Sequence, residues 1–526
     1  MKFATRAIPL VLSASTALAA GTLEFSLGSE RRSHFPDIAE RDVKGTSESA
    51  LSTNYANSVG MRYLVNLTVG TPPQPQTVLI DTGSSDTIFV AADASFCSGK
   101  SKSHCPGGTY NTSASSTFKM LSPDGIDAHY GVNATATSGE GGIDADLVTD
   151  VIQVGNIIVG GAHFGVAHQM DGKFLGNGDY VGLLGLANTL QEAVKPGQPK
   201  YPTFVESLVG AGAIASRVFS LYLNEVSSYG SILFGGVDTE KYTGDLMTLN
   251  FRPLVLTTGE SLVSYSFMRM EEVSMTHEDG TQTALIVSSG PKLNVIPDSG
   301  TSTWNVPTDV YNTVVNMTGV TVSGSNAALP CSQIPNKTTF TFTFSGNGEN
   351  KAKLEVPLSS FFIPASRADG KGVVRMGGQD MCLLMVAPSN PSSGVLLMGD
   401  PVLRAGYWVF DMDNGQISIA QARLSSTSSN IVAVEAGPHG IMNATRQPSG
   451  LAANQTEQVA KTATASVSFS LSTAASAVGQ TSGPQSTVLS GGAVGSMLDV
   501  TAMMSLASAL LLSVTFGAFF VVNIVC

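Results

Sequence analysis

The chain has 526 residues, of which 43% are hydrophobic and 13% are charged, which is enough for two or more domains with sizeable cores. Its formal net charge of −12 would repel phosphate backbones, so the composition argues against a nucleic-acid partner. The same acidic balance suits a protein that works at low pH, where many carboxylates are protonated.

The N-terminus predicts export. Residues 1–20 begin with two basic side chains, continue with a short apolar core over 8–18, and offer small residues for cleavage at 17–20. This is the pattern of a secretory signal peptide. A buried helix is the alternative, but no amphipathic period supports it.

The segment that follows, residues 21–60, is polar and charge-rich and has no sustained apolar period. We interpret it as a propeptide, with Arg31-Arg32 as a candidate dibasic processing point. Its charged groups could shield a site until the medium is acidified. A flexible linker is the alternative interpretation.

From residue 63 onward the pattern is that of strands. Apolar and polar residues alternate over 63–69, a turn follows at 70–73, and an apolar strand over 77–80 leads into Asp81. Further strands are expected at 148–159 and 218–223, and helical period is confined to 203–208 and 308–315. We therefore predict an all-β fold with two lobes, residues 61–240 and 241–423, split near 236–246.

One short pattern occurs twice. The first copy reads Asp81-Thr82-Gly83-Ser84 and the second reads Asp298-Ser299-Gly300-Thr301, each after an apolar run, and they lie 298 − 81 = 217 residues apart. A single copy would indicate a surface turn. Two copies in the same context predict two similar lobes that each deliver one carboxylate to a shared cleft.

The paired motifs resemble those of the pepsin-like aspartic endopeptidases, and the resemblance extends over residues 63–422. Two hydrophobic-hydrophobic-Gly elements, 183–186 and 397–400, match the strands that pass beside each Asp loop in that family. Residues 231–238, followed by 242–244, resemble the strand that closes the first lobe. Residues 407–420 resemble the last strands of the second.

The resemblance implies a catalytic dyad of Asp81 and Asp298, two carboxylates about 3 Å apart that share one proton and activate a water molecule. Asp298 would be the ionised base and Asp81 the acid. Six flanking residues would support the dyad. Gly83 and Gly300 would allow the carboxylates to approach closely, and Thr82 and Ser299 would join the two loops. Ser84 and Thr301 would donate hydrogen bonds to the outer carboxylate oxygens. Ordinary turn capping is the alternative role for the hydroxyls.

The family covers its cleft with a hairpin flap that carries a tyrosine, and Tyr130-Gly131 lies at the matching place. The next residues, Val132 and Asn133, replace the usual hydroxyl residue and glycine. Three further departures are Ile88 in place of a common Trp, Pro297 before the second Asp, and Trp304 after it. These departures bear on flap behaviour, substrate preference and turnover, but leave the dyad intact.

The cysteines are expected to form bridges, because export implies an oxidising compartment. We pair Cys97 with Cys105 and Cys331 with Cys382, as their positions after each motif and the family resemblance suggest; sequence alone leaves other pairings open. Cys526 is the odd one. No metal or other cofactor is expected, because no Cys-x-x-Cys or histidine cluster accompanies these residues.

Composition changes after residue 423. Residues 424–496 are rich in Ser, Thr, Ala and Gly and predict an extended, O-glycosylated stalk, or equally an unstructured linker. Residues 497–526 are an apolar tail with no basic residue after it, which matches a signal for glycosylphosphatidylinositol (GPI) attachment. A retained transmembrane helix is the rival interpretation. The candidate attachment residues are Ser490, Gly491, Gly492, Gly495 and Ser496.

Seven Asn-x-Ser/Thr sequons are compatible with a secreted glycoprotein. They begin at Asn66, Asn111, Asn133, Asn316, Asn336, Asn443 and Asn454.

The leading hypothesis is a secreted, monomeric aspartic endopeptidase, GPI-anchored at the cell surface or wall, that cleaves polypeptides at acid pH and resembles fungal yapsin- and candidapepsin-like enzymes. The first alternative, motivated by the flap changes, is a catalytically weak or inactive surface protein that binds peptides. The second is an activity limited to maturing or shedding neighbouring surface proteins, which an anchor would favour through local concentration.

Overall fold

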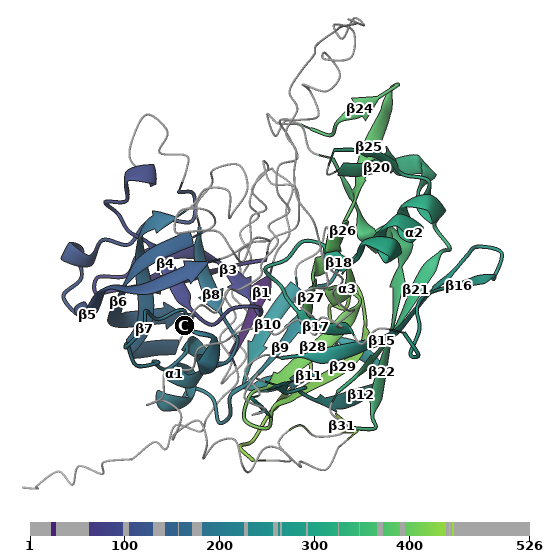
Figure 1. The fold of residues 1–526 in the computed structure, drawn as a ribbon. Coiled ribbons are helices and arrows are strands. Elements are labelled where there is room, and N and C mark those ends of the chain that lie inside the picture. The colour runs from purple at the N-terminus through teal and green to yellow at the C-terminus, as the bar shows by residue number, and fades with distance from the viewer. Residues whose placement is uncertain are drawn as a thin grey trace, which may run out of the picture.

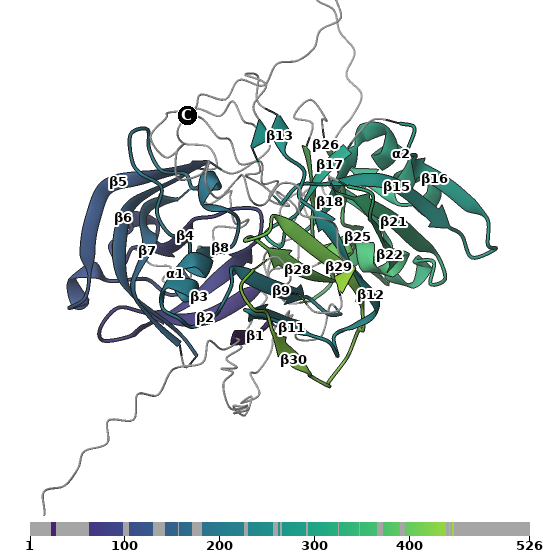
Figure 2. The same ribbon diagram turned by 90° about the horizontal axis from the view of Figure 1, so that it is seen from below.

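The structure is a computed structural model that describes residues 23–27 and 63–445. Within that span the description omits residues 98–104, 130–141, 156, 171–180, 226–229, 256–260, 263–265, 291–292, 325, 347, 366–371, 390–394, 438–440 and 442–443. The described chain consists mostly of strands, which confirms the predicted all-β fold. Figures 1 and 2 show two groups of strands with a third sheet between them.

The first lobe is a seven-stranded sheet in the order β2-β3-β8-β4-β7-β6-β5. Its strands are β2 (Leu64–Val69), β3 (Gln74–Asp81), β4 (Thr87–Val90), β5 (Lys119–His129), β6 (Gly142–Val154), β7 (Ile157–Met170) and β8 (Gly182–Gly185). The single strand expected over 148–159 was wrong. β6 ends at Val154, and β7 returns antiparallel from Ile157, because Gly155 adopts a φ of 54° that turns the chain.

The second lobe is an eight-stranded sheet with a smaller sheet beside it. The large sheet contains β15 (Met268–Thr276), β16 (Gln282–Ile286), β17 (Leu293–Pro297), β18 (Trp304–Pro307), β21 (Thr339–Ser345), β22 (Lys351–Pro357), β26 (Val386–Ser389) and β27 (Val395–Met398). The smaller sheet contains β19 (Thr321–Ser323), β20 (Asn326–Pro330), β23 (Phe362–Pro364), β24 (Arg375–Met376) and β25 (Gln379–Leu384). A separate hairpin joins β13 (Leu254–Val255) and β14 (Ser261–Leu262).

A third sheet, the inter-lobe sheet, combines strands from both halves of the chain and lies between the lobes (Figure 1). In spatial order it contains β1 (Leu23–Leu27), β10 (Gly230–Phe234), β9 (Val218–Tyr222), β28 (Gly406–Asp411), β29 (Gln416–Ala422), β12 (Tyr242–Asn250) and β31 (Ala444–Thr445). β1 lies within the predicted propeptide, which therefore contributes one edge of this sheet. The strand expected over 231–238 is interrupted at Gly235, and β11 (Gly236–Asp238) follows it.

Helices are few and short. α1 (Phe204–Gly210) and α2 (Thr308–Thr318) occupy the two places where helical period was found. α1 begins with a capping box between Thr203 and Glu206, and α2 ends at the left-handed Gly319. α3 (Asp400–Leu403) was not predicted. The 3₁₀ turns are η1 (Ser95–Cys97), η3 (Thr112–Ala114), η4 (Thr189–Gln191), η5 (Cys331–Gln333) and η6 (Leu358–Phe361).

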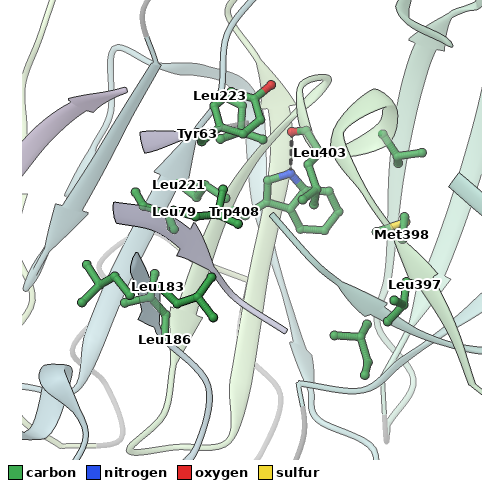
Figure 3. Close-up of a cluster of buried hydrophobic side chains, with 14 of the residues drawn as sticks. Tyr63, Leu79, Leu183, Leu186, Leu221, Leu223, Leu397, Met398, Leu403 and Trp408 are labelled. Atoms are coloured by element: carbon green, nitrogen blue, oxygen red, sulfur yellow. Dashed lines mark hydrogen bonds between the residues drawn. The ribbon is translucent and has the colours of Figure 1, made fainter. Parts of the chain in front are cut away.

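The main hydrophobic core runs from one lobe to the other through the inter-lobe sheet. Figure 3 shows Leu79 and Leu183 of the first lobe, Leu221 and Trp408 of the inter-lobe sheet, and Met398 of the second lobe in this core. The indole Nε1 of Trp408 donates to the carbonyl of Leu403 at 2.8 Å. Apolar burial therefore contributes to joining the two lobes.

The described residues between 424 and 445, assigned to the stalk by composition, lie instead against the inter-lobe sheet, and we call them the C-terminal strap. Within the strap, β30 (Ile431–Ala433) pairs with β11, and β31 pairs in parallel with β12. Val434 is 2% exposed and Ile441 is 6% exposed, in a second core cluster. Burial of these apolar side chains adds to the strand pairing that holds the strap against the sheet.

Both predicted disulfides are present. Cys97 bonds to Cys105 with a Cα–Cα distance of 5.6 Å, and Cys331 bonds to Cys382 with a Cα–Cα distance of 4.9 Å. The second ties η5 to β25 across the smaller sheet of the second lobe. The predicted signal peptide and apolar tail, and Cys526, lie outside the described residues.

Candidate active site

The two Asp motifs end two equivalent strands. Asp81 is the last residue of β3, which pairs in parallel with β8 so that Asp81 is opposite Gly185. Asp298 follows β17, which pairs in parallel with β27, and its backbone N–H donates to the carbonyl of Met398 at 3.0 Å. The hydrophobic-hydrophobic-Gly elements therefore lie beside the Asp loops, as the family resemblance predicted.

The donors around each carboxylate match one another. The Asp81 Oδ1 atom accepts from the Gly83 N–H at 2.9 Å, and its Oδ2 accepts from the Ser84 hydroxyl at 2.5 Å. At the second loop, Asp298 Oδ1 accepts from the Gly300 N–H at 2.8 Å, and Oδ2 accepts from the Thr301 hydroxyl at 2.6 Å. The repeated sequence thus builds the same local structure twice, because each donor lies two or three residues after its Asp.

Thr82 and Ser299 join the loops across the two lobes. The Thr82 hydroxyl donates to the carbonyl of Pro297 at 2.8 Å and accepts from the Ser299 N–H at 3.0 Å. In the reciprocal pair, the Ser299 hydroxyl donates to the carbonyl of Ile80 at 2.8 Å and accepts from the Thr82 N–H at 3.1 Å. All four bonds are buried, so the loops are held in one register.

The carboxylates themselves meet, since Asp81 and Asp298 hydrogen-bond to each other through their side chains. A Cβ atom placed on Gly83 would lie 2.7 Å from Asp298 Cγ, and one placed on Gly300 would lie 2.8 Å from Asp81 Oδ1. Each glycine therefore allows the opposite carboxylate to approach its backbone. No larger residue fits at either position without moving the pair.

Burial changes the titration of this pair. Asp81 is 1% exposed and Asp298 is 0% exposed. Burial raises the pKa of Asp81, while the hydrogen bonds from Ser84 and Gly83 lower it. Burial, together with the negative charge of Asp81, raises the pKa of Asp298 well above its usual range. Two buried carboxylates in contact cannot both ionise readily, so the pair retains one proton in the acid range.

Burial raises the pKa of both carboxyl groups, and the family resemblance predicted Asp298 as the ionised base and Asp81 as the acid. The proton can pass along the hydrogen bond that joins the two side chains, so we assign it to the pair rather than to either residue. The separate base and acid roles stay a prediction.

The predicted flap lies on the β5–β6 hairpin, whose last paired residues are His129 and Gly142. Tyr130, Gly131, Val132 and Asn133 lie in the connection, outside the described residues. Ile88 is fully buried and packs against the backbone of Gly165, where a Cβ would lie 2.7 Å from Ile88 Cδ1. It therefore fills the interior of the first lobe.

Trp304 is also a core residue. It is fully buried in the second lobe and contacts the rings of Phe340, Phe342 and Phe361. Its place after the second Asp loop serves packing.

Among the sequon residues, Asn111, Asn316 and Asn336 are exposed. Asn66 is partly buried, and its Oδ1 accepts from the Thr77 hydroxyl at 2.7 Å. Asn133, Asn443 and Asn454 lie outside the described residues, as do the five candidate attachment residues. Within the described part of the chain, no group of three or more His, Cys, Asp or Glu side chains could hold a metal ion. No helix there is both long enough and apolar enough to span a membrane.

A charged cluster next to the Asp loops was not predicted from the sequence. Tyr63, Asp400 and Arg404 are 1%, 1% and 3% exposed and form a connected group. The available signal was the pair Asp400 and Arg404, an acid and a base four residues apart in an otherwise apolar segment.

Two lobes that each present one carboxylate, with matched donors and a hydrogen bond between the acids, define an aspartic-type peptidase. The family model for eukaryotic aspartyl proteases matches residues 62–422, so the chain belongs to that family. The strap, residues 424–445, lies beyond the match.

Curated relatives agree with this membership. The chain is 33% identical over 432 residues to "Probable aspartic-type endopeptidase OPSB" of Arthroderma benhamiae, a match that covers 80% of each chain. It is 28% identical to "Aspartic proteinase yapsin-3" of Saccharomyces cerevisiae, over 74% of this chain and 70% of the relative. "Aspartic proteinase 3" of the same yeast is 27% identical, over 70% of this chain and 71% of the relative. The protein is thus an aspartic-type endopeptidase whose substrates are polypeptides.

Proposed function

We propose that Asp81 and Asp298 are the catalytic pair and that they hydrolyse peptide bonds in acid. The observation that carries this is the direct hydrogen bond between two buried carboxylates, each held by a backbone N–H and a hydroxyl group of its own loop. One ionised and one protonated carboxyl group together supply a base and an acid at the same point.

In the proposed reaction the ionised member of the pair removes a proton from a water molecule, which attacks the carbonyl carbon of the peptide. The protonated member gives its proton to the carbonyl oxygen as negative charge develops there. Ser84 and Thr301 hold the outer oxygens, so the inner oxygens face the reacting atoms. The Thr82–Ser299 contacts keep the two acids aligned throughout.

The setting of the activity is also a proposal. The signal-like N-terminus, the dibasic site and the sequons support secretion of a glycosylated zymogen. The apolar tail supports a GPI anchor at the plasma membrane or cell wall. We further propose a monomer that binds no nucleic acid, in keeping with the formal net charge of −12.

The activity is tested with secreted protein, matured by acidification and incubated with denatured haemoglobin or casein across about pH 3 to 5. We expect cleavage that a statine-type inhibitor blocks and that Asp298→Asn abolishes. Asp279→Asn is the matched control, because Asp279 is a surface carboxylate in a turn of the second lobe. Absence of cleavage by the matured wild-type protein throughout acid pH would contradict the proposal. Equal cleavage by Asp298→Asn would show that the pair is not the catalytic site.

A further inference from the structure

Behind the two Asp loops lies a buried charged cluster that the proposed reaction does not use. The hydroxyl of Tyr63 donates to Oδ1 of Asp400, and Nη1 of Arg404 donates to Oδ2 of the same carboxylate. Nη2 of Arg404 reaches the carbonyl of Ser360 at 2.5 Å. Tyr63 belongs to the first lobe, whereas Asp400 and Arg404 belong to the second, so the cluster crosses between the lobes.

On the first-lobe side, a single backbone hydrogen bond connects the cluster to the strand that ends in Asp81. The carbonyl of Tyr63 accepts from the N–H of Ile80 at 2.9 Å, and Ile80 is the residue before Asp81. The hydroxyl of Tyr63 therefore bonds to the second lobe, and its backbone carbonyl bonds to the first. A shift of Tyr63 would be transmitted directly to the strand end that carries Asp81.

On the second-lobe side the connection is equally short. The N–H of Asp400 donates to the carbonyl of Thr301 at 3.0 Å, and the Thr301 hydroxyl donates to Oδ2 of Asp298 at 2.6 Å. The preceding residue, Gly399, has no room for a side chain, since a Cβ there would lie 2.1 Å from the Thr301 carbonyl oxygen. The start of α3 is thus packed tightly against the loop of Asp298.

The surroundings of Tyr63 are apolar. Figure 3 shows its ring in the core with Leu403 and Trp408. Burial and the negative charge of Asp400 raise the pKa of Tyr63 well above its usual range, so the hydroxyl keeps its proton and remains a donor.

We propose that Tyr63, Asp400 and Arg404 form an inter-lobe latch that sets the spacing of the two catalytic carboxylates. The proposal rests on the proposed function of Asp81 and Asp298. The three are positioning residues, because they act through the loops and do not touch the reacting atoms.

The contacts of the latch allow a positioning role to be tested apart from general stabilisation of the fold. Arg404 and Asp400 lie four residues apart at one helix, so their ion pair stays within the second lobe when Tyr63 loses its hydroxyl. The Tyr63 carbonyl likewise keeps its bond to Ile80 within the first lobe. Tyr63→Phe therefore keeps these pairings within each lobe and removes the Tyr63–Asp400 bond, while the Thr82 and Ser299 bonds between the lobes remain.

The test compares Tyr63→Phe with Tyr110→Phe in the secreted, matured enzyme. Tyr110 is a suitable control because it is 1% exposed and its hydroxyl also donates to a carboxylate, Asp150, which lies within the first lobe. A fluorogenic peptide gives kcat and KM across acid pH, and thermal unfolding gives the stability of each variant.

We expect Tyr63→Phe to lower kcat about tenfold with KM within about twofold, because small errors in the position of reacting groups are costly. The pH range over which Tyr63→Phe is active should also narrow. When the carboxylates lie farther apart, the charge of one raises the pKa of the other less, so the upper apparent pKa falls. The hydrogen bond that stabilises the singly protonated pair also weakens, so the lower apparent pKa rises. Tyr110→Phe should lose similar thermal stability but keep the wild-type kcat and pH profile.

The latch is overturned if Tyr63→Phe keeps the wild-type kcat and profile width while the wild-type enzyme is active. Inactive wild-type enzyme would instead reject the proposed function, so the two failures are distinguishable. Should Tyr63→Phe fail to fold, Arg404→Lys keeps the buried positive charge and loses the planar two-sided contact to Asp400 and Ser360. It should give the same narrowing of the profile, and an unchanged profile would overturn the latch.

Discussion

The free energy of unfolding of Asp411→Asn should fall less than that of the parent protein as the pH rises. Asp411 ends β28 in the inter-lobe sheet and is 2% exposed. Its carboxylate accepts from the Asn414 backbone N–H at 3.0 Å and from the Asn414 side chain at 2.7 Å. Burial raises the pKa of Asp411 to about 6 even though both bonds from Asn414 lower it. The folded protein therefore holds this proton more tightly than the unfolded chain does.

The sign and the size follow from linkage. The unfolded pKa is about 3.9 and the folded pKa is about 6, so the folded state binds more protons between these values. Its stabilisation is complete below about pH 4 and is lost as the pH rises through about 6. Two pKa units correspond to about 3 kcal/mol. Asparagine does not titrate, so in the variant this position contributes no loss of stability as the pH rises.

The measurement is urea unfolding at several values between pH 4 and 7, in protein that also carries Asp298→Asn to prevent self-digestion. Fluorescence reports on Trp304 and Trp408, the two tryptophans of the chain, and Trp408 lies on the same strand as Asp411. The difference in unfolding free energy, Asp411→Asn minus parent, should rise by about 2 kcal/mol over this range, because the unfolded carboxyl is already about half ionised at pH 4. A difference that does not change with pH would refute the reasoning.

Asp279→Asn is the control for that measurement. Asp279 is exposed, and the hydrogen bonds from Thr281 lower its pKa. A lowered carboxyl pKa contributes stability above the unfolded value and loses it as the pH falls. This variant should therefore show a small trend of the opposite sign. The same trend in both variants would mean that a change in net charge, and not burial, is being measured.

Three further outcomes are expected. Ser299→Ala should cost about 2–4 kcal/mol in urea unfolding, because it leaves the Ile80 carbonyl and the Thr82 N–H buried without a partner; a cost below about 1 kcal/mol would contradict this. Gly300→Ala should lower kcat about a hundredfold, because its Cβ would lie 2.8 Å from Asp81 Oδ1, whereas Gly160→Ala, with no atom within 4 Å, should leave kcat unchanged; equal effects would be the adverse result. Ending the chain after Ala422 should lower Tm by several degrees relative to ending it after Thr445, because the strap covers the second core cluster; equal Tm values would show that the strap is dispensable.

The Asp loops could be predicted because the motif and the donors to each carboxylate are local. The apolar lead-in, the Asp, the hydroxyl residue and the Gly are consecutive, and each carboxylate takes its donors from the next three residues. The strands beside the loops could also be recognised, since 183–186 and 397–400 carry the same short pattern. The cysteine pairings were suggested by the positions of the cysteines after each motif together with the family resemblance, although sequence alone left other pairings open.

What the sequence did not show depends on distant contacts. The inter-lobe sheet brings β1 next to β10 and β31 next to β12, pairings that no local period encodes. The strap was hidden by its average composition, because its apolar run over 431–434 is short and is flanked by Ser, Thr, Asn, Glu and Gly residues. Tyr63 read as the start of a strand, and only the fold reveals that its hydroxyl meets Asp400 more than three hundred residues later.

The central claim is that Asp81 and Asp298 share one proton and need it for catalysis. The most direct test is kcat/KM against pH for the matured enzyme, measured alongside Asp81→Asn and Asp298→Asn. We predict a bell-shaped profile with two acid-range limbs for the wild type and no measurable turnover for either variant. A profile with a single limb, or turnover in either variant, would contradict the shared proton.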